Sequence, residues 1–484
     1  MRKFYFLIIM CLTVSMLSAS VVKTVTTTLA GTLSTIITVD ESTTVTDLTV
    51  TGPIDAQDFK FMRDNLTLLA NIDLSSASIV AYSGTNGPLS ASTDYPANTV
   101  PNSAFLIGTQ LVTTPGKASL ISVVLPNSIV AFADKAFNKC LNLTTLNIPS
   151  SVGIIGAMCF QNCQSLASVT LPTNLVIIQN NTFQNCYKIK SIEIPSSVTT
   201  INGSAFIGCT GLTSFVIPST VTSIGSSLFS GCTNMKTVVM SSGLTTSGIS
   251  TFLNCTSLTS VTLPSNITLI DQYSFKNCTA LTAFVIPSTV NTLGQNCFLG
   301  CTALVSIEIP SSVTTMSLGL FMGCSSIATL TFQENTGTIA SIGGNQSYQD
   351  CVGLKEIYLN RKLVPSCQAS FFQNVVVGNV KLYVPVASLA LYQADPFWKT
   401  FQSISVISTS TGVSTQQEDD FKVYTTPSGI EVISTVANEL IEVYSTLGVR
   451  VATTSTQVGP TYIVVPKGAI YIVRMGGMTS KVIF

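Results

Sequence analysis

Short runs of alternating apolar and polar residues recur along residues 120–324, and the copies are spaced 23 residues apart. The copy at residues 189–209 shows the pattern, because Ile192 and Ile194 flank the polar Glu193. Successive side chains of a strand point to opposite faces, so this run predicts a short strand with the isoleucines inward and the glutamate outward. Stacked copies would form one parallel sheet along one face of the array.

A second inward-facing pair follows the strand in each copy. Pro195 ends the strand because proline has no N–H for a central ladder, and Val198 and Ile201 then turn inward on the second side. The segment with Phe206 and Cys209 is expected to be a helical or 3₁₀ half-turn whose phenylalanine fills the middle of the coil. The sequence therefore predicts turns and short helices opposite the sheet.

Phenylalanine and cysteine are the most regular members of the repeat. A phenylalanine precedes each cysteine by three residues, and the pair occurs nine times. A fixed period of 20–29 residues is typical of a leucine-rich-repeat solenoid, in which each turn buries its apolar residues against the next. We therefore predict an α/β leucine-rich-repeat solenoid. The nine cysteines are Cys140, Cys163, Cys186, Cys209, Cys232, Cys255, Cys278, Cys301 and Cys324.

Composition and charge exclude several classes of protein. The chain has 484 residues, a net charge of zero, 9% charged residues and no histidine. The lack of basic clusters argues against nucleic acid as a partner. After the N-terminus there is no run of roughly 18 apolar residues, so no transmembrane segment is expected in the mature chain.

Residues 1–20 have the features of a secretory signal peptide. Arg2 and Lys3 supply a positive start, residues 4–17 are almost entirely apolar, and small residues at 18–20 supply a cleavage site. We expect the mature protein to be exported.

The rest of the chain divides by composition and by the regularity of the repeat. Helical spacing at Phe59 and Met62 predicts a capping helix before the first repeat strand, and Trp398 is interpreted as part of the core of a C-terminal cap. We expect an N-terminal cap with degenerate repeats at 21–117, regular repeats at 118–335, irregular repeats and a C-terminal cap at 336–405, a Ser/Thr/Gln-rich linker at 406–420, and a further domain at 421–484.

The C-terminal domain has seven short apolar runs separated by turn residues. That number and spacing predict a small all-β, immunoglobulin-like sandwich.

The repeat resembles the BspA-like class of leucine-rich repeats. The shared phrase is Leu-x-x-Ile-x-Ile-Pro-Ser-Ser-Val-x-x-Ile-x-x-x-Ala-Phe-x-x-Cys, and the resemblance covers roughly residues 50–405. It implies a surface or secreted protein that serves adhesion and recognition.

The C-terminal domain resembles the sorting domain of the type IX secretion system, on the phrases at residues 443–451 and 467–481. This resemblance implies contact with outer-membrane secretion machinery through residues 421–484. It also implies removal of the tail and a location outside, or on the outer surface of, a Gram-negative bacterium. An ordinary accessory β-domain is the alternative.

The cysteines could form disulfides in an exported protein, since stacked neighbours lie within bridging distance. One cysteine per turn, however, is the arrangement of a small buried residue, so we predict reduced thiols in the core. Cys159 with Cys163, and Cys297 with Cys301, share a turn and are the expected exceptions.

No catalytic or metal site is predicted. Without histidine there is no Ser-His-Asp arrangement and no imidazole metal ligand, and no phosphate-binding or dinucleotide motif occurs. Glu193 and Glu308 lie five repeats apart, which is about 24 Å by the strand spacing and too far for a carboxylate pair. We expect no enzymatic activity and no cofactor.

The outward row of the predicted sheet remains as the candidate binding surface. Exposed aliphatic side chains indicate a binding surface more than exposed serines do. The adjacent row consists almost entirely of hydroxyl residues. We predict a face that binds protein or glycan ligands on host or neighbouring cells; the alternative is a structural component of the cell envelope without a specific ligand. The candidate contact residues are Glu193, Val216, Val239, Thr262, Val285 and Glu308.

Overall fold

The structure is a computed structural model that forms two compact units, Met1–Ile407 and Ser408–Phe484, and each is described by itself. The predicted signal peptide lies outside the described residues except for Ser20, and so does the predicted linker except for its first two residues. The structure describes residues 20–89, 94–107, 115–334, 341–407, 421–426, 429–434, 440–445, 450–456, 459–465, 470–475 and 478–483.

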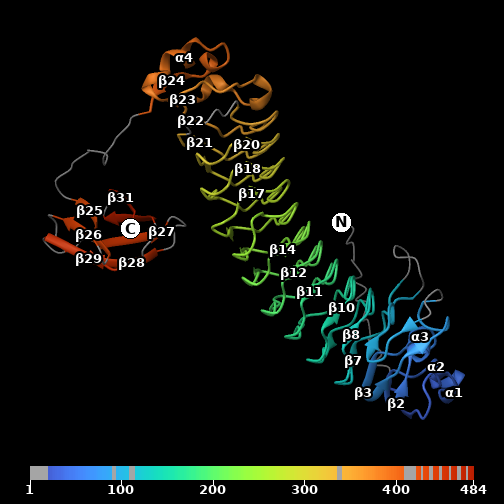
Figure 1. The fold of residues 1–484 in the computed structure, drawn as a ribbon. Coiled ribbons are helices and arrows are strands. Elements are labelled where there is room, and N and C mark those ends of the chain that lie inside the picture. Colours follow the sequence, from blue (N-terminus) through green and yellow to red (C-terminus); the bar gives the residue numbers. More distant parts are fainter. Residues whose placement is uncertain are drawn as a thin grey trace, which may run out of the picture. The chain divides into compact units, whose positions relative to one another are not determined.

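The first unit is a solenoid whose successive turns stack on one another (Figure 1). The predicted sheet is present as one parallel ladder in three stretches, and within each stretch neighbouring strands pair in parallel. Its strands are β1 (Val22–Thr26), β2 (Asp47–Ile54), β3 (Asn71–Ile79), β7 (Ser122–Val124), β9 (Thr145–Leu146), β13 (Ser214–Val216), β15 (Thr237–Val239), β16 (Ser260–Thr262), β19 (Ser306–Ile309), β21 (Thr329–Phe332), β22 (Glu356–Leu359), β23 (Lys381–Val384) and β24 (Ser403–Val406).

A second parallel ladder runs along another side of each turn, where the sequence predicted only an inward-facing pair. Its two-residue strands also pair in register between turns. They are β6 (Thr99–Val100), β8 (Ala131–Phe132), β10 (Ile154–Ile155), β11 (Ile177–Ile178), β12 (Thr200–Ile201), β14 (Ser223–Ile224), β17 (Leu269–Ile270), β18 (Thr292–Leu293) and β20 (Thr315–Met316).

The prediction of short helices opposite the sheet is wrong for the regular repeats, because residues 115–334 contain no helix. Two left-handed residues in each turn, such as Asn181 and Asn185 (both φ 58°), prevent a continuous helix. Alternate N–H groups instead donate to the next turn, as Phe183 does to the Ala205 carbonyl (2.9 Å) and Asn185 to the Ile207 carbonyl (2.8 Å). The third side is therefore also held by hydrogen bonds between turns.

The repeated phenylalanines form a continuous stack through the core. Neighbouring ring centroids are 5.0–6.1 Å apart and the interplanar angles are 7–24°. Phe105 of the degenerate repeat starts this stack, Tyr348 replaces phenylalanine where the period slips, and Phe372 of the C-terminal cap continues it. The stack thus joins the irregular turns to the regular ones.

The thirteen described cysteines are free thiols, and all except Cys367 are buried. The expected exceptions are wrong, because Cys159 and Cys163, and Cys297 and Cys301, are also free. From Cys163 onward, each thiol of the 23-residue series donates to the carbonyl of the phenylalanine in the preceding turn, as Cys209 does to Phe183 (3.0 Å). Cys351 continues the pattern after the period slips, with Phe321 as its acceptor (3.1 Å). Burial raises the pKa of Cys209 to about 12. The sequence identified the cysteine as a small core residue but missed its role as a donor between turns.

The N-terminal cap contains the predicted helix. Helix α3 (Ala56–Asp64) follows the short helices α1 (Leu33–Ile36) and α2 (Val39–Ser42), and it begins with a capping box formed by Asp55 and Asp58. Phe59 and Met62 are fully buried, as their spacing predicts. Phe59 packs edge-on against Phe105, which ties the helix to the aromatic stack.

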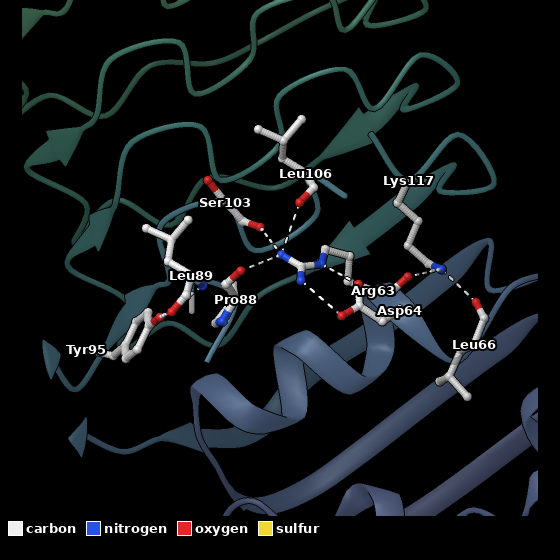
Figure 2. A network of polar contacts seen from close by, with 9 residues as sticks. All are labelled: Arg63, Asp64, Leu66, Pro88, Leu89, Tyr95, Ser103, Leu106 and Lys117. Atoms are coloured by element: carbon white, nitrogen blue, oxygen red, sulfur yellow. Dashed lines mark hydrogen bonds and ion pairs between the residues drawn. The ribbon is translucent and has the colours of Figure 1, made fainter. Parts of the chain in front are cut away.

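The C-terminal end of α3 carries a buried arginine with a full set of partners (Figure 2). Arg63 Nη1 donates to the carbonyls of Pro88 (3.0 Å), Ser103 (3.1 Å) and Leu106 (3.0 Å). Its Nε and Nη2 bond the two carboxylate oxygens of Asp64 (2.6 and 3.0 Å). One guanidinium therefore connects the capping helix to the loops of the first repeat.

Lys117 lies in the same network and is also buried. Its Nζ donates to the Leu66 carbonyl (2.6 Å) just after α3 and to the Arg63 carbonyl (3.3 Å) in its last turn. Burial lowers the pKa of Lys117 to about 8.

The C-terminal cap of the solenoid contains α4 (Leu389–Ala394) and the 3₁₀ helices η1 (Ala369–Phe372), η2 (Val377–Asn379), η3 (Val386–Ser388) and η4 (Trp398–Thr400). Trp398 is fully buried, and its Nε1 donates to the Pro365 carbonyl (3.1 Å). The interpretation of Trp398 as cap core is confirmed.

The second unit contains antiparallel strands in two sheets, ordered β25-β26-β29 and β28-β27-β30-β31. Ile430 and Val432 from one sheet share a buried cluster with Ile441 and Val443 from the other. The immunoglobulin-like classification stays a prediction. The strands are β25 (Phe421–Thr426), β26 (Gly429–Ser434), β27 (Leu440–Ser445), β28 (Arg450–Ser455), β29 (Gly459–Ile463), β30 (Ile470–Met475) and β31 (Met478–Ile483).

Candidate recognition surface

The outward row of the first ladder is the surface that the sequence singled out, and all six predicted contact residues are exposed on it. Val216 and Val285 are the more exposed of the three candidate valines, with 61% and 60% of their surface in solvent, and Val239 has 42%. The inward neighbours Phe215 and Val238 are buried. The core therefore fixes the strand, and the valines project from a rigid support.

Strand register places three of the six residues side by side. Val216 of β13 pairs with Val239 of β15, and Val239 pairs with Thr262 of β16. Val285 and Glu193 belong to turns in which this segment forms no assigned strand. The structure thus brings together a strip of two valines and one threonine, with the other candidates further along the row.

Glu308 lies in β19 and has a partner of its own. Its Oε1 accepts a hydrogen bond from Gln333 Nε2 (2.6 Å). The backbone of Glu308 pairs with Thr331 of β21. This end of the row is therefore polar, in contrast to the valine strip.

An aromatic pair that the sequence analysis missed continues the same row. Tyr358 of β22 pairs with Thr331 and with Tyr383 of β23, and the two tyrosine rings stack with centroids 4.5 Å apart at an angle of 7°. The Glu356 carboxylate accepts from both phenols (3.2 and 3.5 Å). Burial, and then the charge of Glu356, raise the pKa of Tyr358. Both tyrosines are half-buried.

The sequence contains the pattern that places this pair in the row, but at a position shifted from the regular 23-residue period. The step from Cys324 to Cys351 is 27 residues instead of 23, so the outward position shifts when residues are counted at a fixed period. Aligning the β22 run on its buried residues, Ile357 and Leu359, places Tyr358 in the row.

A second exposed apolar cluster lies on the other ladder. Val130, Ile154, Val176 and Ile177 are exposed, and Ile154 has 61% of its surface in solvent. Equivalent positions in later turns are Thr200 and Ser223. Comparing equivalent positions of the second strand would have identified it.

The described residues contain no group of three or more His, Cys, Asp or Glu side chains that could hold a metal ion. They also contain no helix long and apolar enough to cross a membrane.

The comparison with protein families gives one match, the BspA type leucine-rich repeat region, at residues 115–236, 199–328 and 269–393. These overlapping matches cover residues 115–393, more than half of the 484-residue chain. The chain belongs to the BspA-type leucine-rich repeat family. This BspA-type chain gave no match among curated proteins.

Three of the solved structures similar to this BspA-type chain are described as leucine-rich proteins. A leucine-rich repeat protein from Bacteroides ovatus is 23% identical over 64% of this chain and 91% of its own, with a TM-score of 0.39. A leucine rich cell surface protein from Faecalibacterium prausnitzii is 20% identical over 75% of this chain and 84% of its own, also with a TM-score of 0.39. The leucine-rich repeat protein of T. pallidum is 29% identical over 38% of this chain and 78% of its own, with a TM-score of 0.29.

Proposed function

We propose that this BspA-type protein is a secreted or cell-surface recognition protein that binds protein or glycan ligands through the outward row of its first ladder. The observation that carries the proposal is the valine strip, in which Val216 and Val239 are exposed on adjacent strands above a packed core. When a partner covers exposed aliphatic residues on a rigid sheet, the burial of their apolar surface contributes favourably to the free energy of binding.

The chemistry of the row suits an extended partner. Hydroxyl residues flank the valines, because Ser214, Thr237 and Ser260 occupy the neighbouring outward positions of the same three strands. Such a face supplies apolar contact in the middle and hydrogen-bonding groups beside it, which is the usual composition of a binding surface.

Binding of the purified solenoid to a panel of immobilised matrix proteins and glycans tests the proposal. Val216→Lys and Val285→Lys should each raise the Kd by at least about tenfold, or ~1.4 kcal/mol, because a buried lysine replaces an apolar contact. Val352→Lys is the matched control, since Val352 is 66% exposed and lies outside the row. Equal loss in all three variants would contradict recognition by this face.

A structural component of the cell envelope without a specific ligand is the second candidate. The Ser/Thr composition of the row beside the valines, broken only at Ala283, favours it, since solvated hydroxyls need no ligand. This candidate gains support if the purified solenoid binds nothing on the panel while deletion of its gene weakens the envelope.

We further propose that residues 421–484 direct export by a type IX secretion system to the outer surface of a Gram-negative bacterium. The signal peptide predicted at residues 1–20 and the phrases at 443–451 and 467–481 support this route. Deleting residues 421–484 should trap the protein in the periplasm, as fractionation would detect. Normal surface display of the truncated protein would refute the sorting role.

A further inference from the structure

Arg361 is a buried arginine whose charged end has no hydrogen-bond partner among the described residues. It follows β22 by two positions, and only 5% of its surface is exposed. Neither Nη1 nor Nη2 makes a hydrogen bond there. Native proteins satisfy nearly all buried polar groups, so each exception needs an explanation, such as a bound ion.

The cost of this arrangement is high because a guanidinium stays charged at any physiological pH and carries five N–H donors. A buried charge without a partner strongly destabilises a fold. The other buried arginine among the described residues, Arg63, is different. It is 6% exposed, and its guanidinium donates hydrogen bonds to three carbonyls and one carboxylate (Figure 2).

The surroundings of Arg361 bring three parts of the solenoid together. Its own carbonyl accepts from Ser388 Oγ of η3 (3.2 Å) and from the Tyr392 hydroxyl of α4 (3.4 Å). Tyr348, from the last turns of the aromatic stack, is close enough to influence the pKa of Arg361. Arg361 thus lies where the final repeats meet the C-terminal cap.

No negative charge from these neighbours balances the guanidinium. Tyr348 and Tyr392 are phenols, and burial raises the pKa of both, so they are neutral at physiological pH. The nearest ion pair in sequence, Lys362 with Glu334 (3.0 Å), is exposed and involves the adjacent residue instead.

We propose that Arg361 binds a small oxyanion that bridges the last repeats and the C-terminal cap. Two free η nitrogens in one plane match the two oxygens of a phosphate, sulfate or carboxylate group. The side chain is almost fully covered, which favours a small free ion over a group on a macromolecule. The site is separate from the outward row and does not depend on its function.

Thermal unfolding of the full mature chain tests this site, with phosphate, sulfate and acetate each added at constant ionic strength against sodium chloride. The variants are Arg361→Met, which keeps an extended side chain without the charge, and Arg361→Lys, which keeps the charge without the two coplanar η nitrogens. In chloride alone, Arg361→Met should match or exceed the wild-type Tm. An oxyanion should raise the wild-type Tm in a saturating manner, raise that of Arg361→Lys less, and leave that of Arg361→Met unchanged.

Calorimetric titration of the same proteins with phosphate and with acetate provides the second measurement. We expect one site per chain in the wild type, and at least a tenfold weaker site in Arg361→Lys. Either order of affinity between phosphate and acetate supports the proposal and identifies the preferred oxyanion. Equal Tm responses of the wild type and Arg361→Met, or heat of binding that Arg361→Met retains, would overturn it. If Arg361→Met does not fold, equal binding by Arg361→Lys and the wild type would do the same.

Discussion

The aromatic stack should behave as the main structural link between neighbouring turns, and Phe229 is the residue that tests this. Phe229 is fully buried, and its ring lies 5.9 Å from Phe206, 5.9 Å from Phe252 and 4.6 Å from Phe215. Phe229→Ala removes three aromatic contacts at once and leaves a cavity at the centre of a turn. Such changes cost about 3–5 kcal/mol, and we expect the upper half of that range.

The location of Phe229 predicts a second effect beyond the lost free energy. A solenoid is stabilised by contacts between neighbouring turns, so a defect in one turn weakens both of its interfaces. The N-terminal and C-terminal parts should then unfold at different urea concentrations. Trp398 is the only tryptophan and is buried in the C-terminal cap, so its fluorescence reports that end alone.

The assay uses the solenoid alone, residues 21–407, so that the second unit contributes no signal. It compares urea unfolding by far-ultraviolet circular dichroism with unfolding by Trp398 fluorescence. In the wild type the two midpoints should coincide, whereas in Phe229→Ala they should separate. Val216→Ala is the control, because Val216 is 61% exposed and its truncation should change stability by less than about 0.5 kcal/mol. A loss below about 1 kcal/mol in Phe229→Ala, or equal losses in both variants, would refute the role of the stack.

Three further predictions concern the caps and the core. The pKa of Lys117 is about 8 in the folded chain against an ordinary 10.5, so the unfolded chain binds more protons between these values and stability rises with pH across that window. Relative to Lys117→Met, the wild type should gain up to about 3 kcal/mol from pH 8 to pH 10.5 in denaturant titrations, and a flat difference would contradict this. The chain denatured without reductant should titrate all thirteen described cysteines as thiols, and one free thiol or none would contradict the reduced core. Gly156→Ala should cost about 1–3 kcal/mol, because its Cβ would lie 2.5 Å from the backbone nitrogen of Asp134. Gly153→Ala is the control, since its Cβ would meet nothing closer than 3.7 Å, and equal Tm values for the two variants would contradict the steric argument.

The sequence predicted the solenoid because its information is repeated. One 23-residue period specifies which residues turn inward, so an error in one copy is corrected by the others. Outside the repeats, helical spacing identified Phe59 and Met62 as buried cap residues, and Trp398 was correctly interpreted as cap core. It was wrong about the helices of the regular repeats, because helical spacing of Phe and Cys cannot be told from a turn with two left-handed residues.

The candidate surface was predicted in part. Exposure of the six residues followed from the alternation alone, but the extension of the row to Tyr358 and Tyr383 required the strand register after the period had slipped. The apolar cluster around Ile154 depends on a second ladder that the sequence pattern did not separate from the core pair.

By itself, the sequence determined the periodic properties of this protein: the inward residues, the parallel stacking and the ends of the array. Each follows from the hydrophobic effect acting on a local pattern that repeats. Only the tertiary structure decided the properties that depend on a particular neighbour. These are the donation of each thiol to a carbonyl one turn away, the full set of partners around Arg63 and the missing ones around Arg361. Hydrogen bonds have direction and short range, so the sequence cannot specify them until the fold has brought donor and acceptor together.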